Sequence, residues 1–154
     1  MPKREGEFFI IDMLVALELI QRKTESMVVP EDLLRDEDAW LAVTRSLEIV
    51  GEAMKHVLES TTLKDLTKPA WRDVVDFRNV VVHEYFGINA DQIFDIVKTE
   101  VPGLEKDLIS MLKRHPNQDV VLWVIEQAKN DLEYSHRFAS LEYVEELQKI
   151  LKGM

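Results

Sequence analysis

The sequence predicts an all-α protein: an antiparallel four-helix bundle over residues 1–114, followed by a helical extension over residues 115–154. Only five Gly and five Pro occur among 154 residues, which is unlike a turn-rich all-β protein. Apolar residues recur at steps of three and four along most of the chain, the spacing of one helix face. The length and the hydrophobic fraction of 46% suit a single domain with a real core.

The first predicted helix extends from about Glu5 to Thr24. The apolar residues of one face are Phe9, Met13, Leu17 and Ile20. We expect a loop around Pro30, and then an acidic run at residues 36–38. Acidic residues at this point favour the start of a second helix near Asp38, because a helix N-terminus carries partial positive charge.

The second predicted helix has the most regular apolar stripe in the chain. Its members alternate at three and four residues: Trp40, Val43, Leu47, Val50, Met54 and Val57. Gly51 interrupts the helix, at a cost of about 1 kcal/mol relative to Ala. We therefore expect a neighbouring helix to approach closely at Gly51.

The third and fourth predicted helices are marked by capping and breaking residues. Thr67 is placed to cap the third helix, with Pro69 in its first turn and Gly87 at its end. Asn89 is placed to cap the fourth helix. The pair at 102–103, Pro-Gly, predicts a kink or break inside that helix.

The extension follows a break at residues 115–117 (His-Pro-Asn). Two more helices are predicted, at about 119–138 and 140–152. The apolar run at residues 120–125 also fits a buried strand by periodicity alone. We favour helix, because a lone strand in a helical bundle has no partner.

Composition bounds the classes of function. The chain has no Cys, which removes disulfides and thiolate chemistry, and we expect a soluble, cytoplasmic protein. The apolar stretch 8–20 contains Asp12 and Glu18, so we interpret it as a buried helix and not a leader, and no run is long enough to span a membrane. The net charge of −10 opposes general nucleic-acid coating, so any action on RNA needs a local positive cleft.

Residues 78–85 gather side chains that can act on a phosphodiester. On one ideal helix Arg78 and Tyr85 are separated by roughly 20° but by about 10 Å along the axis. His83 lies about 140° from Arg78, while Asn79 and His83 are an i, i+4 pair. One straight helix therefore does not bring all of them together. Either the helix unwinds near His83, or a second copy of the chain completes the site.

A purely structural interpretation of this segment is also open. Arg, His and Tyr near a helix end can cap carbonyl groups, pair with Glu84 or Asp76, and pack against neighbours. A short spacing pattern alone has a high rate of chance matches. The wider context is what favours a functional site.

That context resembles the HepT-like HEPN family over most of residues 8–114. The resemblance lies in residues 45–53 (RSLEIVGEA), 69–75 (PAWRDVV) and 78–88 (RNVVVHEYFGI). The last block contains the family motif R-x-x-x-x-H-x-Y in full. Three separated blocks in the right order are more specific than the motif alone.

The resemblance implies a metal-independent endoribonuclease toxin that works as a homodimer on RNA, needs no cofactor, and has a minimal nucleotidyltransferase as its antitoxin. It also implies that the antitoxin silences the toxin by transferring AMP to Tyr85. Glu52 and Glu84, which belong to the matching blocks, are candidates for lining the cleft.

The residue types fit this chemistry. RNA carries its own nucleophile, the 2′-OH, so cleavage needs a proton acceptor, a proton donor and a cation beside the phosphate. His83 titrates near neutral pH and Arg78 offers a planar fork of donors. Asn79 is suited to orienting the phosphate or His83.

An alternative is a catalytically silent HEPN domain that binds a nucleotidyltransferase partner or a nucleotide. A protein metal site is not expected, because the remaining histidines have no i, i+4 histidine partner and there is no Cys. For His56, His115 and His136 we expect surface or capping roles. Trp40 and Trp71 are expected in the core or at an interface.

Overall fold

The computed structural model describes residues 6–82 and 90–153, and within these ranges all regular structure is helical. The α-helices are α1 (Gly6–Thr24), α2 (Pro30–Leu34), α3 (Glu37–Glu59), α4 (Arg72–Val75), α5 (Phe77–Val82), α6 (Ala90–Asp95), α7 (Val101–Arg114), α8 (Gln118–Tyr134) and α9 (Phe138–Lys152). Two 3₁₀ turns, η1 (Lys64–Leu66) and η2 (Pro69–Trp71), precede α4, and a π-helical turn, η4 (Ile96–Glu100), precedes α7. The all-α prediction is confirmed.

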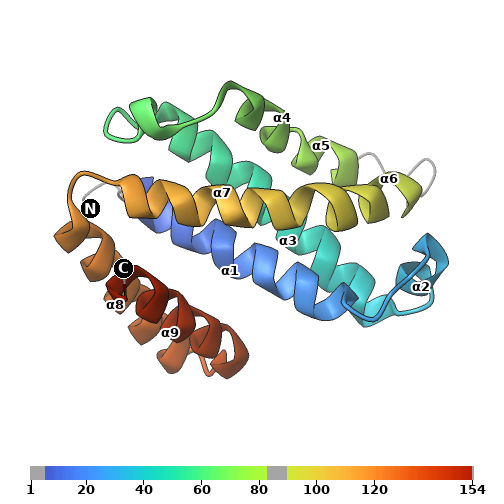
Figure 1. Ribbon diagram of the computed structural model, residues 1–154. Helices are drawn as coiled ribbons and strands as arrows, with labels where there is room; N and C mark the ends of the chain where they lie inside the picture. The colour runs from blue at the N-terminus through green and yellow to red at the C-terminus, as the bar shows by residue number, and fades with distance from the viewer. Residues whose placement is uncertain (1–5, 83–89, 154) are drawn as a thin grey trace.

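The helices α1, α3, α4, α5 and α7 form an antiparallel bundle (Figure 1). α1 and α3 run in opposite directions and pack along each other, α4 and α5 pack on α3, and α7 packs on α1. α2 closes one end of the bundle by contacting α3 and α6. None of the described helices combines the length and apolar character needed to cross a membrane.

The core lies between α1, α3 and α7. On α3 the predicted stripe is confirmed: Val43, Leu47, Val50, Met54 and Val57 are all 0% exposed. Trp40, at the start of the stripe, is only partly buried, whereas Trp71 is 3% exposed. Each large aliphatic side chain buried in this way contributes about 1.5–3 kcal/mol to folding.

The predicted loop around Pro30 contains a short helix, α2, so that prediction is wrong in detail. The Asp32 carboxylate accepts the backbone N–H groups of Val28 at 2.9 Å and Val29 at 3.2 Å, which fixes the first turn. These hydrogen bonds lower the pKa of Asp32 below its usual value. Leu33 is fully buried and attaches α2 to the bundle.

The third predicted helix is divided into η2, α4 and α5, and Thr67 does not cap it. The Thr67 hydroxyl donates to the carbonyl of Lys64 at 2.9 Å, so it is engaged in the preceding 3₁₀ turn. Pro69 is in the first turn of η2, as expected of a residue without an N–H. Gly87 and Asn89, the predicted end and cap, lie outside the described residues.

The irregularity predicted at residues 102–103 is found one turn earlier, as the π-helical turn η4. Pro102 lies in the first turn of α7 and has no N–H to bond the carbonyl four residues before it. A π turn is a known way to accommodate such a break. Lys98 in η4 donates from Nζ to the carbonyl of Thr24 at 2.7 Å, which joins this turn to the end of α1.

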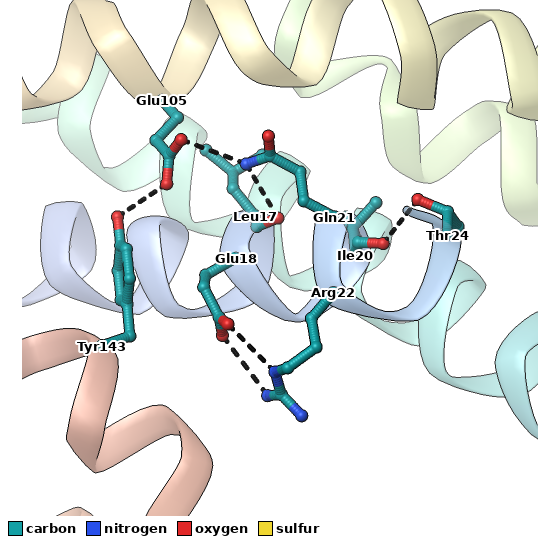
Figure 2. Close-up of polar contacts among 8 residues, drawn as sticks. All are labelled: Leu17, Glu18, Ile20, Gln21, Arg22, Thr24, Glu105 and Tyr143. Atoms are coloured by element: carbon teal, nitrogen blue, oxygen red, sulfur yellow. Dashed lines mark hydrogen bonds and ion pairs between the residues drawn. The ribbon is translucent and has the colours of Figure 1, made fainter. Parts of the chain in front are cut away.

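α8 and α9 form a helical hairpin that packs against α1, away from α4 and α5 (Figure 1). Residues 120–125 are helical, as favoured from the sequence. Figure 2 shows the Glu105 carboxylate of α7 accepting the Tyr143 hydroxyl of α9 at 2.8 Å and the Gln21 amide of α1 at 3.1 Å. Burial, with Glu105 as a neighbour, raises the pKa of Tyr143.

Candidate functional site

The motif begins on α5, where Arg78 and Asn79 lie in the first turn and are exposed to solvent. Phe77 and Val81 are buried, so α5 is fixed to the bundle by one face while its polar face is open. His83, Glu84 and Tyr85 lie outside the described residues. The structure therefore gives the surroundings of the arginine end of the motif.

Gly51 of α3 sets how closely α5 approaches. A Cβ atom at Gly51 would lie 3.0 Å from the carbonyl oxygen of Val75 and 3.2 Å from the backbone nitrogen of Arg78. Both contacts are tighter than ordinary van der Waals packing. The close approach expected at Gly51 is confirmed, and it involves the backbone of Arg78 itself.

Two polar contacts surround the motif residues on this face. Nη1 of Arg78 lies 3.4 Å from Oε2 of Glu52 on α3, and the two side chains are 59% and 49% exposed. Nδ2 of Asn79 lies 3.4 Å from Oδ1 of Asp76. The structure thus brings Arg78 together with Glu52, a residue 26 positions earlier in the chain.

A shallow groove of about 210 Å³ lies between α1 and α3 and reaches Glu52. Phe9 of α1 stacks on the His56 ring of α3 at 4.3 Å, with only 10° between the planes. Arg45 contacts Glu48 at 3.1 Å on the same groove. The pattern of residues along α3 does not predict this groove, because Phe9 and Asp12 come from a different helix, α1.

A second groove, of about 330 Å³, lies on the α4 side of α3. Lys55 and Arg72 line it together with Glu59 and Asp76. Exposed basic side chains therefore surround the α3–α5 contact, but carboxylates from the same grooves lie beside them. Among the described residues, a single copy of the chain does not concentrate positive charge at this site.

The other histidines lie in separate places. His56 is stacked in the first groove, and His136 is exposed, stacked on Phe138, with a positive φ of 58°. Of the surface or capping roles expected for it, His115 has the capping position: it is the C-cap residue of α7, and it is buried against Glu7 and not on the surface. Within residues 6–82 and 90–153, no three His, Cys, Asp or Glu side chains are grouped as a metal site would require.

The family model and the related proteins that match this chain all carry ribonuclease names. Residues 13–111 match the family described as HepT-like, "Ribonuclease HepT-like". A protein of Methanocaldococcus jannaschii, provisionally named an RNase, is 35% identical over 119 residues, which cover 77% of this chain and 97% of the relative. A probable ribonuclease HepT of Thermococcus cleftensis is 33% identical over 67% of this chain and 92% of its own.

A third relative, from Caldanaerobacter subterraneus and also provisionally named an RNase, is 36% identical over 84 residues, covering 54% of this chain and 74% of the relative. No solved structure matches the chain significantly. The family match ends at residue 111, so α8 and α9 lie beyond it.

Proposed function

This chain belongs to the HepT-like ribonuclease family, and from that premise we propose that it is a metal-independent endoribonuclease toxin, active as a homodimer. The ribonuclease family and the ribonuclease names of the relatives support RNA as its substrate. The antitoxin that we propose for it is a minimal nucleotidyltransferase. The observation that carries the proposal is the complete R-x-x-x-x-H-x-Y motif in a chain of this family, with its arginine exposed on a helix fixed against α3.

Cleavage follows from the chemistry of the motif residues. His83 takes the proton of the 2′-OH, the 2′-oxygen attacks the adjacent phosphorus, and the bond from phosphorus to the 5′-oxygen breaks. Protonated His83 then donates a proton to the leaving 5′-oxygen, so that one product ends in a 5′-OH and the other carries a 2′,3′-cyclic phosphate. Arg78 stabilises the negative charge that develops on the phosphoryl oxygens, and Asn79 orients the phosphate or His83.

The site is a cleft shared between two copies of the chain. Arg78 and His83 face different directions on one ideal helix, and carboxylates lie beside the basic groups of a single copy. A two-fold related copy supplies a second arginine and a second histidine to the same cleft. The dimer thereby meets the need for local positive charge in a chain of net charge −10.

Tyr85 is the residue whose modification inactivates the toxin. Its phenolic oxygen attacks the α-phosphorus of ATP on the antitoxin, pyrophosphate leaves, and AMP remains bound to the tyrosine. The added phosphate and nucleoside occupy the cleft next to His83, with Glu84 at its edge. Substrate RNA is then excluded by charge and by volume.

One assay tests the proposal: cleavage of a mixed RNA pool by the purified protein. We expect wild-type protein to cut RNA, and both Arg78→Ala and His83→Ala to lose cleavage while remaining folded by circular dichroism. Prior incubation with the nucleotidyltransferase encoded beside it, with ATP and Mg²⁺, is expected to add one AMP at Tyr85 and to stop cleavage.

Undiminished cleavage by either variant would contradict the catalytic roles. An unmodified Tyr85 after incubation would contradict the regulatory role. Wild-type protein that never cuts RNA but binds the nucleotidyltransferase would favour the catalytically silent alternative.

A further inference from the structure

The Arg78 guanidinium is held from a neighbouring helix through one of its nitrogens. Nη1 contacts Glu52 at 3.4 Å, and the contact crosses from α5 to α3. Nε and Nη2 have no hydrogen-bond acceptor among the residues that the structure describes, and the side chain is 59% exposed. These two nitrogens form the edge with which arginine binds a phosphate in bidentate fashion.

The backbone at this point is fixed as well. Gly51 is adjacent to Glu52, and its missing side chain allows the backbone nitrogen of Arg78 to lie 3.2 Å from where a Cβ would be. The main chain of Arg78 is thus fixed by packing at residue 51, while its side chain is contacted by residue 52. Gly51 and Glu52, which are consecutive on α3, thus position the backbone and the guanidinium of Arg78 respectively.

We infer that Glu52 is a positioning residue, which orients Arg78 so that its free edge faces the scissile phosphate. The inference rests on the proposed ribonuclease function and extends it to a residue outside the motif. If the Arg78 guanidinium is already oriented when RNA binds, less free energy is needed to reach the transition state of cleavage. Glu52 therefore acts on the rate of cleavage through Arg78, without touching the RNA.

A role in folding does not account for the contact. Both side chains are about half exposed, and exposed ion pairs contribute little to stability. As a negative charge close to the substrate phosphate, Glu52 also weakens RNA binding. Removal of the Glu52 carboxylate should therefore lower kcat without raising KM. A simple loss of substrate affinity would instead raise KM.

Steady-state kinetics of RNA cleavage test the inference with Glu52→Ala, Glu52→Gln and a matched control. For Glu52→Ala we expect kcat to fall about tenfold, while KM stays equal or decreases. Glu52→Gln, which keeps an oxygen that can accept from Arg78, should recover part of the lost kcat. The control is Glu146→Ala, because Glu146 is an exposed carboxylate on α9 that pairs with Lys149 at 3.3 Å. It removes the same charge far from α5 and should leave both constants within about twofold of wild type.

The inference is overturned if Glu52→Ala keeps the wild-type kcat, or if its only effect is a higher KM. A second measurement does not depend on activity: the Nε–Hε signal of Arg78 in the ¹⁵N spectrum of the protein. We expect a sharp, dispersed signal in the wild type that broadens or moves to the position of free arginine in Glu52→Ala. An unchanged signal rejects the positioning role even if no RNA is cut, whereas an inactive wild type with a changed signal rejects only the ribonuclease function.

Discussion

Glu7 and His115 form a polar contact inside an otherwise apolar region. Oε1 of Glu7 lies 3.2 Å from Nε2 of His115, and the side chains are 5% and 6% exposed. The backbone N–H of Asn117 donates to Nδ1 of His115 at 3.0 Å, so the ring proton is on Nε2 and is donated to Glu7. Glu7 also lies in the first turn of α1, where the helix dipole favours a negative charge.

His115→Ala should destabilise the protein by about 2–4 kcal/mol, because it leaves a buried carboxylate without its donor. The other Glu7 oxygen, Oε2, is already buried without a hydrogen bond among the described residues. The free energy of unfolding in urea measures this effect. Arg45→Ala is the control, since it breaks an exposed pair and should change stability by less than about 1 kcal/mol. If the two variants lose the same free energy of unfolding, the buried contact does not contribute more to stability than the exposed pair.

Residue types alone did not indicate this contact, and the reason is physical. Glu7 and His115 are 108 positions apart, and a single acidic residue at a helix start is normally solvated. Arg78 and Glu52 were both candidates from the sequence, but their contact depends on the packing of α5 against α3. Spacing within one helix is readable from a sequence, whereas contacts between helices require the fold.

At the scale of elements, the contact between Tyr143 and Glu105 joins α9 to α7. The Tyr143 pKa is raised above its usual value of 10.0, first by burial and then by Glu105. The folded state therefore favours the neutral phenol. The stability that this preference contributes is complete below about pH 10 and is lost as the pH rises above that value.

Tyr143→Phe makes the effect measurable. At pH 8 the wild type should be more stable than the variant by about 1 kcal/mol, the usual net contribution of such a hydrogen bond. At pH 11 that advantage should fall by about 1.4 kcal/mol, because the unfolded tyrosine ionises and the folded one does not. Denaturant unfolding at both pH values measures the difference, and an advantage that is independent of pH would contradict the assignment.

Long helices were predictable from the sequence, and short ones were not. α1, α3, α8 and α9 follow apolar periodicity or clear breaks, and the observed bounds lie within a few residues of the predicted ones. α2 and the 3₁₀ turns have too few residues for a periodic signal and depend on local hydrogen bonds, such as those of Asp32 and Thr67. The break predicted at Pro102 is found as a π-helical turn just before it. Pro102 has no N–H to donate to the carbonyl four residues earlier, and the wider π turn accommodates the missing hydrogen bond.

At the scale of the whole molecule, the bundle presents Arg78 on the exposed face of α5, where its side chain is 59% exposed among the described residues. α5 packs on α3, and grooves lie on both sides of α3. The hairpin of α8 and α9 packs on α1, away from α4 and α5 (Figure 1). This arrangement supports the proposal that a second copy completes the site.

The fold class and the motif were predictable from one sequence, but the completed site was not. Helical periodicity and the three matching blocks identify the bundle and place Arg78 on it. The convergence of Arg78 with His83 depends on residues outside those described and, in the proposed dimer, on a second chain. No spacing rule within one chain supplies that geometry.

The most direct test of the central claim is cleavage of an RNA oligonucleotide that carries a single 2′-deoxy nucleotide at a mapped cleavage position, with EDTA present. Attack by the 2′-OH without metal predicts that the all-ribose RNA is cut in EDTA, leaving a 2′,3′-cyclic phosphate and a 5′-OH, and that the 2′-deoxy substitution abolishes cleavage at that position. Cleavage of the 2′-deoxy RNA at the same bond, or complete loss of activity in EDTA that added Mg²⁺ restores, would contradict the proposed mechanism.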